Sequence, residues 1–284
     1  MRRLLPLLAV LLCVPALSQN FQRYNLSYQD LTEYNPAASM DDRDWQSLYF
    51  RFNLDSPEDC MERTTHIRET SLYGVGDNST VIFTVARDRY SWFRDYCIKG
   101  GFAHGWSFAG GRGQINAGVT MSLDFDRVVW ENAPVATVNT GRKLFLLPDV
   151  SAGLEFRYGG FRAGASVLNA ASPSYYEHGD LLLNNPRMFV SHMSLDLNDR
   201  ATGVTLTPFV LALYDTNVSV DMGLAGNWER IIFTSYAYRN NERRHMVTGG
   251  FHLPYSPFDF HLGFSWSDTL QQKYLTFVIR TLIK

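Results

Sequence analysis

The sequence has few cysteines, a small net charge and no long hydrophobic run after its first 18 residues. Three cysteines occur among 284 residues, and only Cys60 and Cys97 lie beyond residue 18, without the close Cys or His partners that a structural zinc site needs. The net charge of −2 is far from the basic footprint of a nucleic-acid binder. A membrane-spanning helix needs roughly 18 consecutive apolar residues, and none follow the N-terminal run. Zinc sites, nucleic-acid partners and helical membrane spans are therefore excluded.

Catalytic motifs are missing as well. The glycine-rich residues 99–113 contain no phosphate-binding loop, and a loop or a bent strand is the plainer interpretation. Within them, Gly105-Trp106-Ser107-Phe108-Ala109 lacks the final glycine of a nucleophile elbow. The histidines form no H-E-x-x-H arrangement. We therefore predict no catalytic residue, no cofactor and no bound metal.

The first 18 residues are typical of a signal peptide. Arg2 and Arg3 precede an apolar stretch, and Ala16-Leu17-Ser18 is a small-x-small cleavage site. Fourteen apolar residues, 4–17, are too few to cross a hydrocarbon core of about 30 Å as an anchor helix. We expect export across the inner membrane, with the mature chain beginning at Gln19.

The most prominent pattern in the sequence is the alternation of apolar residues with polar or small ones. In residues 218–224 and 259–266, apolar side chains occupy every second position, and polar or small ones lie between them. A period of two places alternate side chains on opposite faces of a β-strand. We expect Leu48, Phe50, Phe52, Val220, Met222, Leu262, Phe264 and Trp266 on an apolar outer face. The predicted lumen-facing residues are Tyr49, Arg51, Asp221, Asp259 and His261.

Such strands recur from residue 44 to the end of the sequence. We expect them at 44–54, 62–73, 80–90, 115–125, 145–158, 160–169, 187–198, 203–214, 218–224, 229–240, 244–253, 259–266 and 273–283. Turn sequences such as Arg157-Tyr158-Gly159-Gly160 separate them. We predict an all-β protein: a transmembrane antiparallel up-and-down β-barrel of roughly 12–14 strands. Its parts would be a signal peptide (1–18), an N-terminal segment (19–43) and the barrel (44–284).

A disulfide between Cys60 and Cys97 is a further possibility. Counting strands places both cysteines in loops at the same end of the barrel, and an exported chain enters an oxidising compartment. Closing the loop of about 37 residues would stabilise the fold by roughly 4 kcal/mol. The alternative is two unpaired thiols.

Several strings resemble the PorP/SprF family of Bacteroidetes outer-membrane proteins, which serve type IX secretion and gliding motility. Tyr34, Asn35, Pro36 and Ala37 match the family's segment after the signal peptide. Residues 158–170 resemble its tyrosine-rich strand and Gly-x-Ser-Val hairpin, and 206–214 its Pro-centred strand. Residues 218–224, with Asp221, and 229–239 resemble the strands that follow. The similarity covers most of the mature chain in order.

The resemblance implies a non-enzymatic barrel in the bacterial outer membrane. Its partners would be outer-membrane lipids and either the periplasmic lipoprotein and ring proteins of the secretion machinery or a secreted surface adhesin. A passive outer-membrane channel or transporter is an alternative with the same fold. A barrel enzyme of the lipase type, using Ser107 or His104, is a weaker one. A soluble secreted β-protein would have to pack its apolar strand faces on each other.

Overall fold

A computed structural model of the chain describes residues 31–40, 44–54, 65–90, 93–129, 142–177, 180–199, 201–229, 231–253, 257–269 and 272–283. These residues form β-strands and three short 3₁₀ helices, η1 (Leu31–Glu33), η2 (Pro36–Met40) and η3 (Ala109–Gly111). The strands are β1 (Trp45–Asn53), β2 (Thr65–Val75), β3 (Ser79–Tyr90), β4 (Phe93–Phe108), β5 (Gly113–Val129), β6 (Arg142–Tyr158), β7 (Phe161–Leu168), β8 (Ser174–Glu177), β9 (Asp180–Asn184), β10 (Met188–Leu195), β11 (Leu197–Asp199), β12 (Val204–Tyr214), β13 (Val218–Trp228), β14 (Ile232–Arg239), β15 (Arg244–His252), β16 (Phe258–Ser267) and β17 (Gln272–Leu282). None of the helices in this part of the chain has the length and hydropathy needed to cross a membrane.

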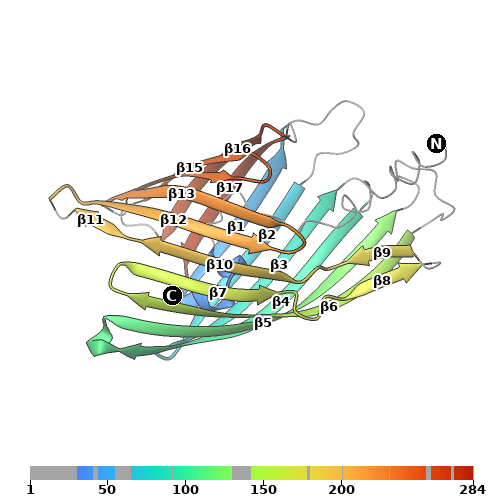
Figure 1. Ribbon diagram of the computed structural model, residues 1–284, viewed down its shortest axis with the longest axis horizontal. Helices are drawn as coiled ribbons and strands as arrows, with labels where there is room; N and C mark the ends of the chain where they lie inside the picture. Colours follow the sequence, from blue (N-terminus) through green and yellow to red (C-terminus); the bar gives the residue numbers. More distant parts are fainter. Residues whose placement is uncertain are drawn as a thin grey trace.

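All strands except β8 and β9 belong to one antiparallel sheet that closes on itself (Figure 1). Each strand pairs with its neighbour in sequence, β1 pairs with β17, and β10 pairs with both β7 and β12. Only Asp196 separates β10 from β11, and both pair with β12, so they count as one barrel strand. The described residues thus form a closed barrel of fourteen strands. The predicted antiparallel up-and-down barrel is confirmed.

The two ends of the barrel differ in their connections. At one end, which we call the turn end, short turns join β2 to β3, β4 to β5 and β6 to β7. The entry to β1 and the exit from β17 also lie there, since Ile283 N donates to Asp44 O over 2.6 Å. The opposite, loop end carries the longer connections, 54–64, 130–141 and 169–187. The last of these contains the separate β8–β9 hairpin.

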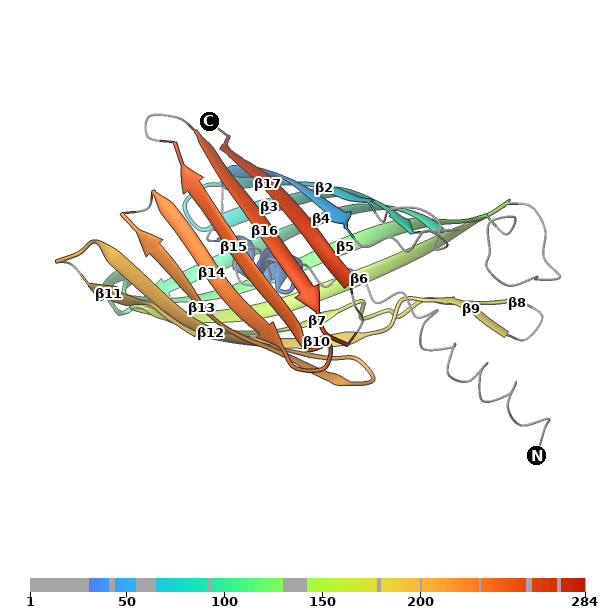
Figure 2. The same cartoon turned by 90° about the horizontal axis from the view of Figure 1, so that it is seen from above.

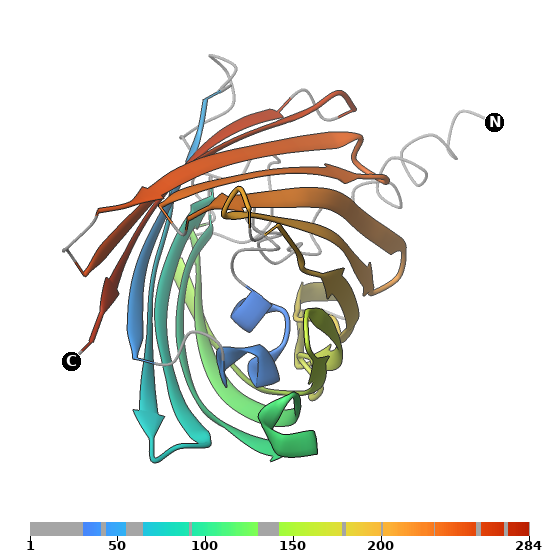
Figure 3. The ribbon, with the colours of Figure 1, turned by 90° about the vertical axis from the view of Figure 1, so that its left-hand side faces the viewer.

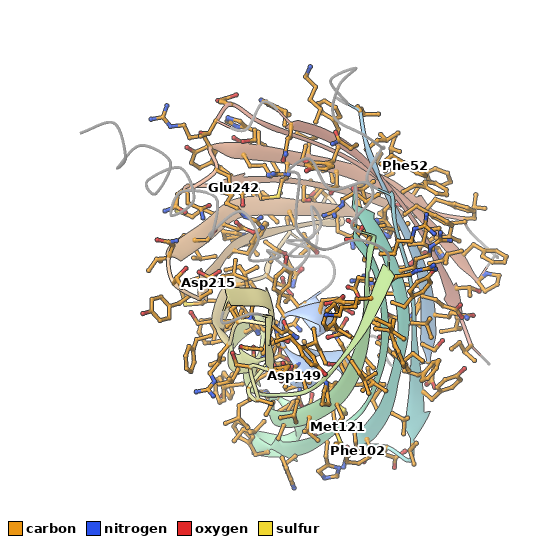
Figure 4. The ribbon with its side chains drawn as sticks, turned by 90° about the vertical axis from the view of Figure 1, so that its right-hand side faces the viewer. Phe52, Phe102, Met121, Asp149, Asp215 and Glu242 are labelled. Carbon is orange, nitrogen blue, oxygen red and sulfur yellow. The ribbon has the colours of Figure 1, made fainter. Side chains whose placement is uncertain are left out.

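Alternation along each strand separates an outer from an inner face. Successive side chains of β10 are buried and exposed in strict order from Met188 to Leu195. Apolar side chains such as Phe52, Phe102 and Met121 are 40%, 44% and 70% exposed on the outside, whereas Asp149 is buried on the inner side of the wall (Figure 4). Phe264 is 36% exposed, so the apolar faces do not pack on a second sheet. This is the outer surface that a strand-crossed membrane requires.

The barrel wall is uneven in height. β5 and β6 have 17 residues each and β4 has 16, whereas β7, β10 and β14 have eight. At about 3.3 Å per residue the long strands measure roughly 55 Å and the short ones roughly 26 Å. The extra length of β5 and β6 projects at the loop end, beside the β8–β9 hairpin (Figure 2).

Two features of the fold differ from the sequence prediction. Residues 93–108 form a full strand, β4, where a glycine-rich loop or bent strand was expected at 99–113. The β8–β9 hairpin was not predicted. The predicted loop position of Cys97 is also wrong. Cys97 is buried within β4, in register with Asp124. Cys60 and the signal peptide, residues 1–18, lie outside the described residues.

Candidate functional site: an N-terminal segment inside the barrel

Residues 31–40, which we call the plug segment, lie inside the barrel (Figure 3). The segment folds locally as a tight double turn. Asn35 N donates to Leu31 O over 2.8 Å, and Ala38 N donates to Asn35 O over 2.9 Å. The Asn35 side chain also caps η2, because its Oδ1 accepts from Ala37 N at 3.0 Å. Asparagine before a helix and proline at its first position are both favoured there.

Asn35 is the centre of the contact between the plug segment and the wall. It is fully buried, and its Nδ2 donates to Leu154 O of β6 over 2.9 Å. The same nitrogen lies 3.2 Å from Nε2 of His192, which is itself buried on β10. Ser166 Oγ of β7 donates to the backbone oxygen of Tyr34. One short motif thus contacts three strands through polar groups that water cannot satisfy.

Three glycines make room for this motif. Gly118 of β5 and Gly153 of β6 are partners in register, and Gly164 lies on the next strand, β7. A Cβ atom on Gly118 would lie 2.5 Å from the carbonyl carbon of Pro36, and one on Gly153 would collide with Asn35 Oδ1. A Cβ atom on Gly164 would lie 2.7 Å from Asn35 Nδ2. We call these three residues the glycine saddle, since they let the backbone of the plug segment rest on the sheet.

Charged groups hold the other face of the segment. Glu33 lies in η1 and is nearly buried, with Oε2 3.1 Å from Lys99 Nζ and Oε1 3.5 Å from Arg68 Nη1. Arg68 belongs to β2 and Lys99 to β4, and each of the two side chains points into the barrel. Two inward cations therefore face one carboxylate of the segment. Removing Glu33 would leave both without that counter-charge.

Apolar contacts continue around the segment to the far wall. Leu31, Tyr34 and Ala38 form one buried cluster with residues of β1, β10, β12 and β17: Tyr49, Met188, Val190, Leu211, Leu213 and Val278. A cavity of about 70 Å³ remains between η1 and the wall, lined by Glu33, Lys99 and Asp124 among others. Its polar lining and its size leave room for ordered water. The segment thus packs against several strands around the interior of the barrel.

The side chains predicted to line the lumen are buried, at separate places in the barrel. Tyr49 and Arg51 lie on β1, where Arg51 is 3.8 Å from Asp88 and the Tyr49 ring packs against His66. Asp221 of β13 is fully buried, and its Oδ1 accepts from Arg239 Nε over 2.6 Å. Asp259 and His261 of β16 are each 6% exposed. Of these five, Tyr49 shares a buried cluster with the plug segment.

Several interior residues were missed by sequence reasoning. Arg239 makes a second bond from Nη2 to Asp221 Oδ2 at 2.8 Å, and the register pairs the two residues directly. Glu155 is buried between Arg157 and Arg162. The pairing of Arg239 with Asp221 could have been inferred from the sequence. An inward-facing Asp needs a cationic partner, and Arg239 lies on the adjacent predicted strand. For the glycine saddle no sequence signal distinguishes these glycines from others.

The described part of the chain contains neither an assembled Ser107–His104 site for a lipase-type enzyme nor a metal site. His104 Nδ1 lies 2.8 Å from Ser79 Oγ, not near Ser107, which is exposed on β4 opposite Gln114. The His104 ring also packs edge-on against Trp106. No group of three or more His, Cys, Asp or Glu side chains among the described residues could hold a metal ion.

Comparisons with known proteins agree with this architecture. A family model described as type IX secretion system membrane protein PorP/SprF matches residues 66–277. No curated protein sequence matches the chain. Among solved structures, the monoaromatic hydrocarbon channel CymD has a TM-score of 0.53 and 9% identity, covering 90% of this chain and 92% of its own. A Pseudomonas aeruginosa FadL homologue also has a TM-score of 0.53 and 9% identity, covering 88% and 93%. The Acinetobacter baumannii outer membrane protein Omp33 has a TM-score of 0.50 and 8% identity, covering 84% and 97%. At these identities the structures show a shared outer-membrane barrel fold.

Proposed function

The chain belongs to the PorP/SprF family of type IX secretion system membrane proteins, and we propose that it acts as a plugged, non-enzymatic barrel of the outer membrane. In this role it anchors or assists another component of the machinery, and it does not conduct solutes. The partner is either a periplasmic lipoprotein or ring protein or a secreted adhesin at the cell surface. Residues 1–18 act as the export signal and are removed.

The observation that carries this proposal is the plug segment, which lies inside the barrel and packs on its wall. The plug segment contacts several strands around the interior: Asn35 lies on the glycine saddle, and Leu31, Tyr34 and Ala38 share a buried cluster with residues of β1, β10, β12 and β17. A channel needs a continuous watery path, and a segment packed inside the barrel obstructs such a path. The outer apolar surface remains available for lipid, and the two ends remain available for proteins.

The connections at the two ends of the barrel support one orientation of the protein in the outer membrane. In outer-membrane barrels the short turns face the periplasm and the longer loops face outward. The turn end, with the entry to β1 and the exit from β17, would then face the periplasmic ring proteins. The loop end, with the β8–β9 hairpin and the tall β5–β6 wall, would face a surface adhesin.

Conductance in planar bilayers tests the plugged state directly. We expect the full-length protein to give no steady current, and a variant lacking residues 31–40 to give one. As a control for folding, both proteins should show the heat-modifiable gel mobility of a closed barrel. Steady conductance by the unaltered protein would favour a passive channel or transporter.

Secretion by cells tests the role in the machinery. We expect a deletion strain to lose export or surface retention of type IX cargo, and the unaltered gene to restore it. Fractionation should recover the protein with outer membranes. Normal cargo export and display in the deletion strain would contradict the anchoring role, and recovery of a soluble periplasmic protein would contradict the membrane location.

A further inference from the structure

Three arginines lie close together on the outer face of the long-strand wall. Arg87, Arg94 and Arg127 belong to the neighbouring strands β3, β4 and β5. Arg94 and Arg127 are direct partners in register, and Arg87 is the partner of Tyr96, two residues from Arg94. We call this set the arginine patch. It lies toward the loop end, near the start of β4 and the end of β5.

The alternation of these strands fixes the side on which the patch lies. Asp95 and Asp126, adjacent in sequence to Arg94 and Arg127, are 7% and 1% exposed inside the barrel. The arginines therefore point to the outer face, and the neighbouring carboxylates to the inner one. The acids cannot reach around the sheet to neutralise the arginines.

The outer face changes character in the same order on β4 and β5. On β4, Phe102 and Ile98 are followed by Tyr96 and then Arg94 toward the loop end. On β5, Met121 is followed by Phe125 and then Arg127. An apolar band, an aromatic residue and then a cation is the sequence expected where lipid tails give way to headgroups. The patch thus lies at the headgroup level of one leaflet.

The arginines have no anionic partner in the described part of the protein. No ion pair or side-chain hydrogen bond there involves Arg94 or Arg127, and Arg87 contacts only the ring of Tyr96, at 5.7 Å. Like charges directly opposite each other on neighbouring strands destabilise a sheet. Arg94 and Arg127 face each other in this way. A bound anion would remove this repulsion.

We propose that the arginine patch binds the phosphate groups of anionic lipids in the leaflet around the loop end. Guanidinium groups match phosphate oxygens with paired hydrogen bonds, which lysine cannot form in the same geometry. The aromatic and apolar side chains below the patch would contact the acyl chains of the same lipid. This inference rests on the proposed function, which places the barrel in the outer membrane, and it adds a lipid-binding site to that function.

Lipid retention by the purified full-length barrel tests the patch. The probe is a phosphatidylcholine vesicle or micelle that contains phosphatidic acid or bisphosphorylated lipid A, with bound lipid counted by native mass spectrometry. We expect the unaltered protein to retain the phosphorylated lipid selectively. Arg127→Gln should weaken retention about fivefold, and the double change R94Q/R127Q more. R94K/R127K, which keeps the charge but not the fork, should lie between these. Arg112→Gln, in the β4–β5 turn at the other end, is the matched control and should change nothing.

Two results would overturn this inference. One is equal retention of phosphorylated lipid by R94Q/R127Q and the unaltered protein, provided that both show the same heat-modifiable mobility. The other is displacement of the lipid by dissolved inorganic phosphate at matched concentration, which would assign the patch to a free anion. Neither result bears on conductance or cargo export, so failure here is distinguishable from failure of the proposed function.

Discussion

The barrel fills its interior in two different ways. The wall from β2 to β7, which we call the N-terminal wall, carries the glycine saddle and receives the plug segment. The wall from β12 to β17, the C-terminal wall, fills its own side with large residues. There Phe209, Ala225, Ala237 and Met246 form a buried cluster, and Arg239 pairs with Asp221. The N-terminal wall receives the backbone of the plug segment, whereas the C-terminal wall meets the segment through apolar side chains of β12 and β17 and elsewhere packs its own residues together.

The difference shows that a closed lumen does not require one continuous core. In the C-terminal wall, the Phe209 ring lies over Gly223, so a side chain from the neighbouring strand occupies the space that the glycine leaves. In the N-terminal wall, the space above Gly118 and Gly153 is occupied by backbone from residues 36 and 37 and by Asn35. We therefore expect changes at Asp221 and Arg239 in the C-terminal wall to reduce stability alone. We expect changes at the glycine saddle of the N-terminal wall to open the lumen.

The largest effect is expected from breaking the charge pair of the C-terminal wall. Asp221→Ala leaves the fully buried Arg239 without its bidentate partner, which should cost about 3–5 kcal/mol of unfolding free energy. Denaturant unfolding followed by tryptophan fluorescence measures this. The lumen should stay closed to ions, because the contacts of Asn35 with the glycine saddle and with Leu154 do not involve Asp221.

The double change D221L/R239M serves as the control for this pair. Replacing both partners with apolar residues of similar volume should recover most of the lost stability. If the double variant is as unstable as Asp221→Ala, the stabilising role of the pair is wrong.

The next largest effect is expected from filling the glycine saddle. Gly153→Val adds atoms where Asn35 Oδ1 lies, and overpacking of this kind costs about 1–3 kcal/mol. We expect displacement of the plug segment and ion conductance in planar bilayers. Gly100→Val is the matched control on the adjacent part of the wall, since no atom lies within 4 Å of its added Cβ. Conductance by both variants, or by neither, would remove the special role of the saddle.

A smaller effect is expected from removing the central amide of the plug segment. Asn35→Ala leaves the partly buried carbonyl of Leu154 and the buried ring of His192 without their shared donor and uncaps η2. We expect a loss of about 1–3 kcal/mol and faster proteolysis within residues 31–40. Asn217→Ala, in an exposed turn, should leave both measurements unchanged. Equal protease resistance of the two variants would argue against Asn35 as the anchor.

The smallest effect is expected at the far end of the plug segment. Thr80 Oγ1 donates to Met40 Sδ over 3.4 Å, and a thioether is a weak acceptor. Thr80→Val should therefore change the unfolding free energy by less than about 1 kcal/mol and leave the lumen closed. A larger loss would mean that the segment is held by its end as much as by Asn35.

Much of the barrel could be predicted from the sequence, because a period of two is a local property. The alternation in residues 218–224 and 259–266 identified strands that the structure contains as β13 and β16. β4 was missed because Gly100, Gly101 and Gly105 interrupt the pattern with positions that have no side chain. At Gly101 a Cβ atom would lie 2.5 Å from Val119 O of the next strand, a constraint that only the paired sheet reveals.

The candidate site was predictable in part for the same reason. The string Tyr34-Asn35-Pro36-Ala37 could be singled out by resemblance, and its capping chemistry is local. Its place inside the barrel could not be predicted, since its partners Leu154 and His192 lie 119 and 157 residues away. Likewise, Asp221 was expected to face inward, but its bond to Arg239 depends on the register of two strands.

The separation of 157 residues between Asn35 and His192 has a consequence for biogenesis. Contacts so distant along the chain form late and slowly during folding. A polypeptide that stops before β10 lacks His192. The side-chain amide of Asn35 then cannot make this contact, and the plug segment is not fully packed in place. The turn therefore completes its native contacts only after strands from the second half of the chain have paired.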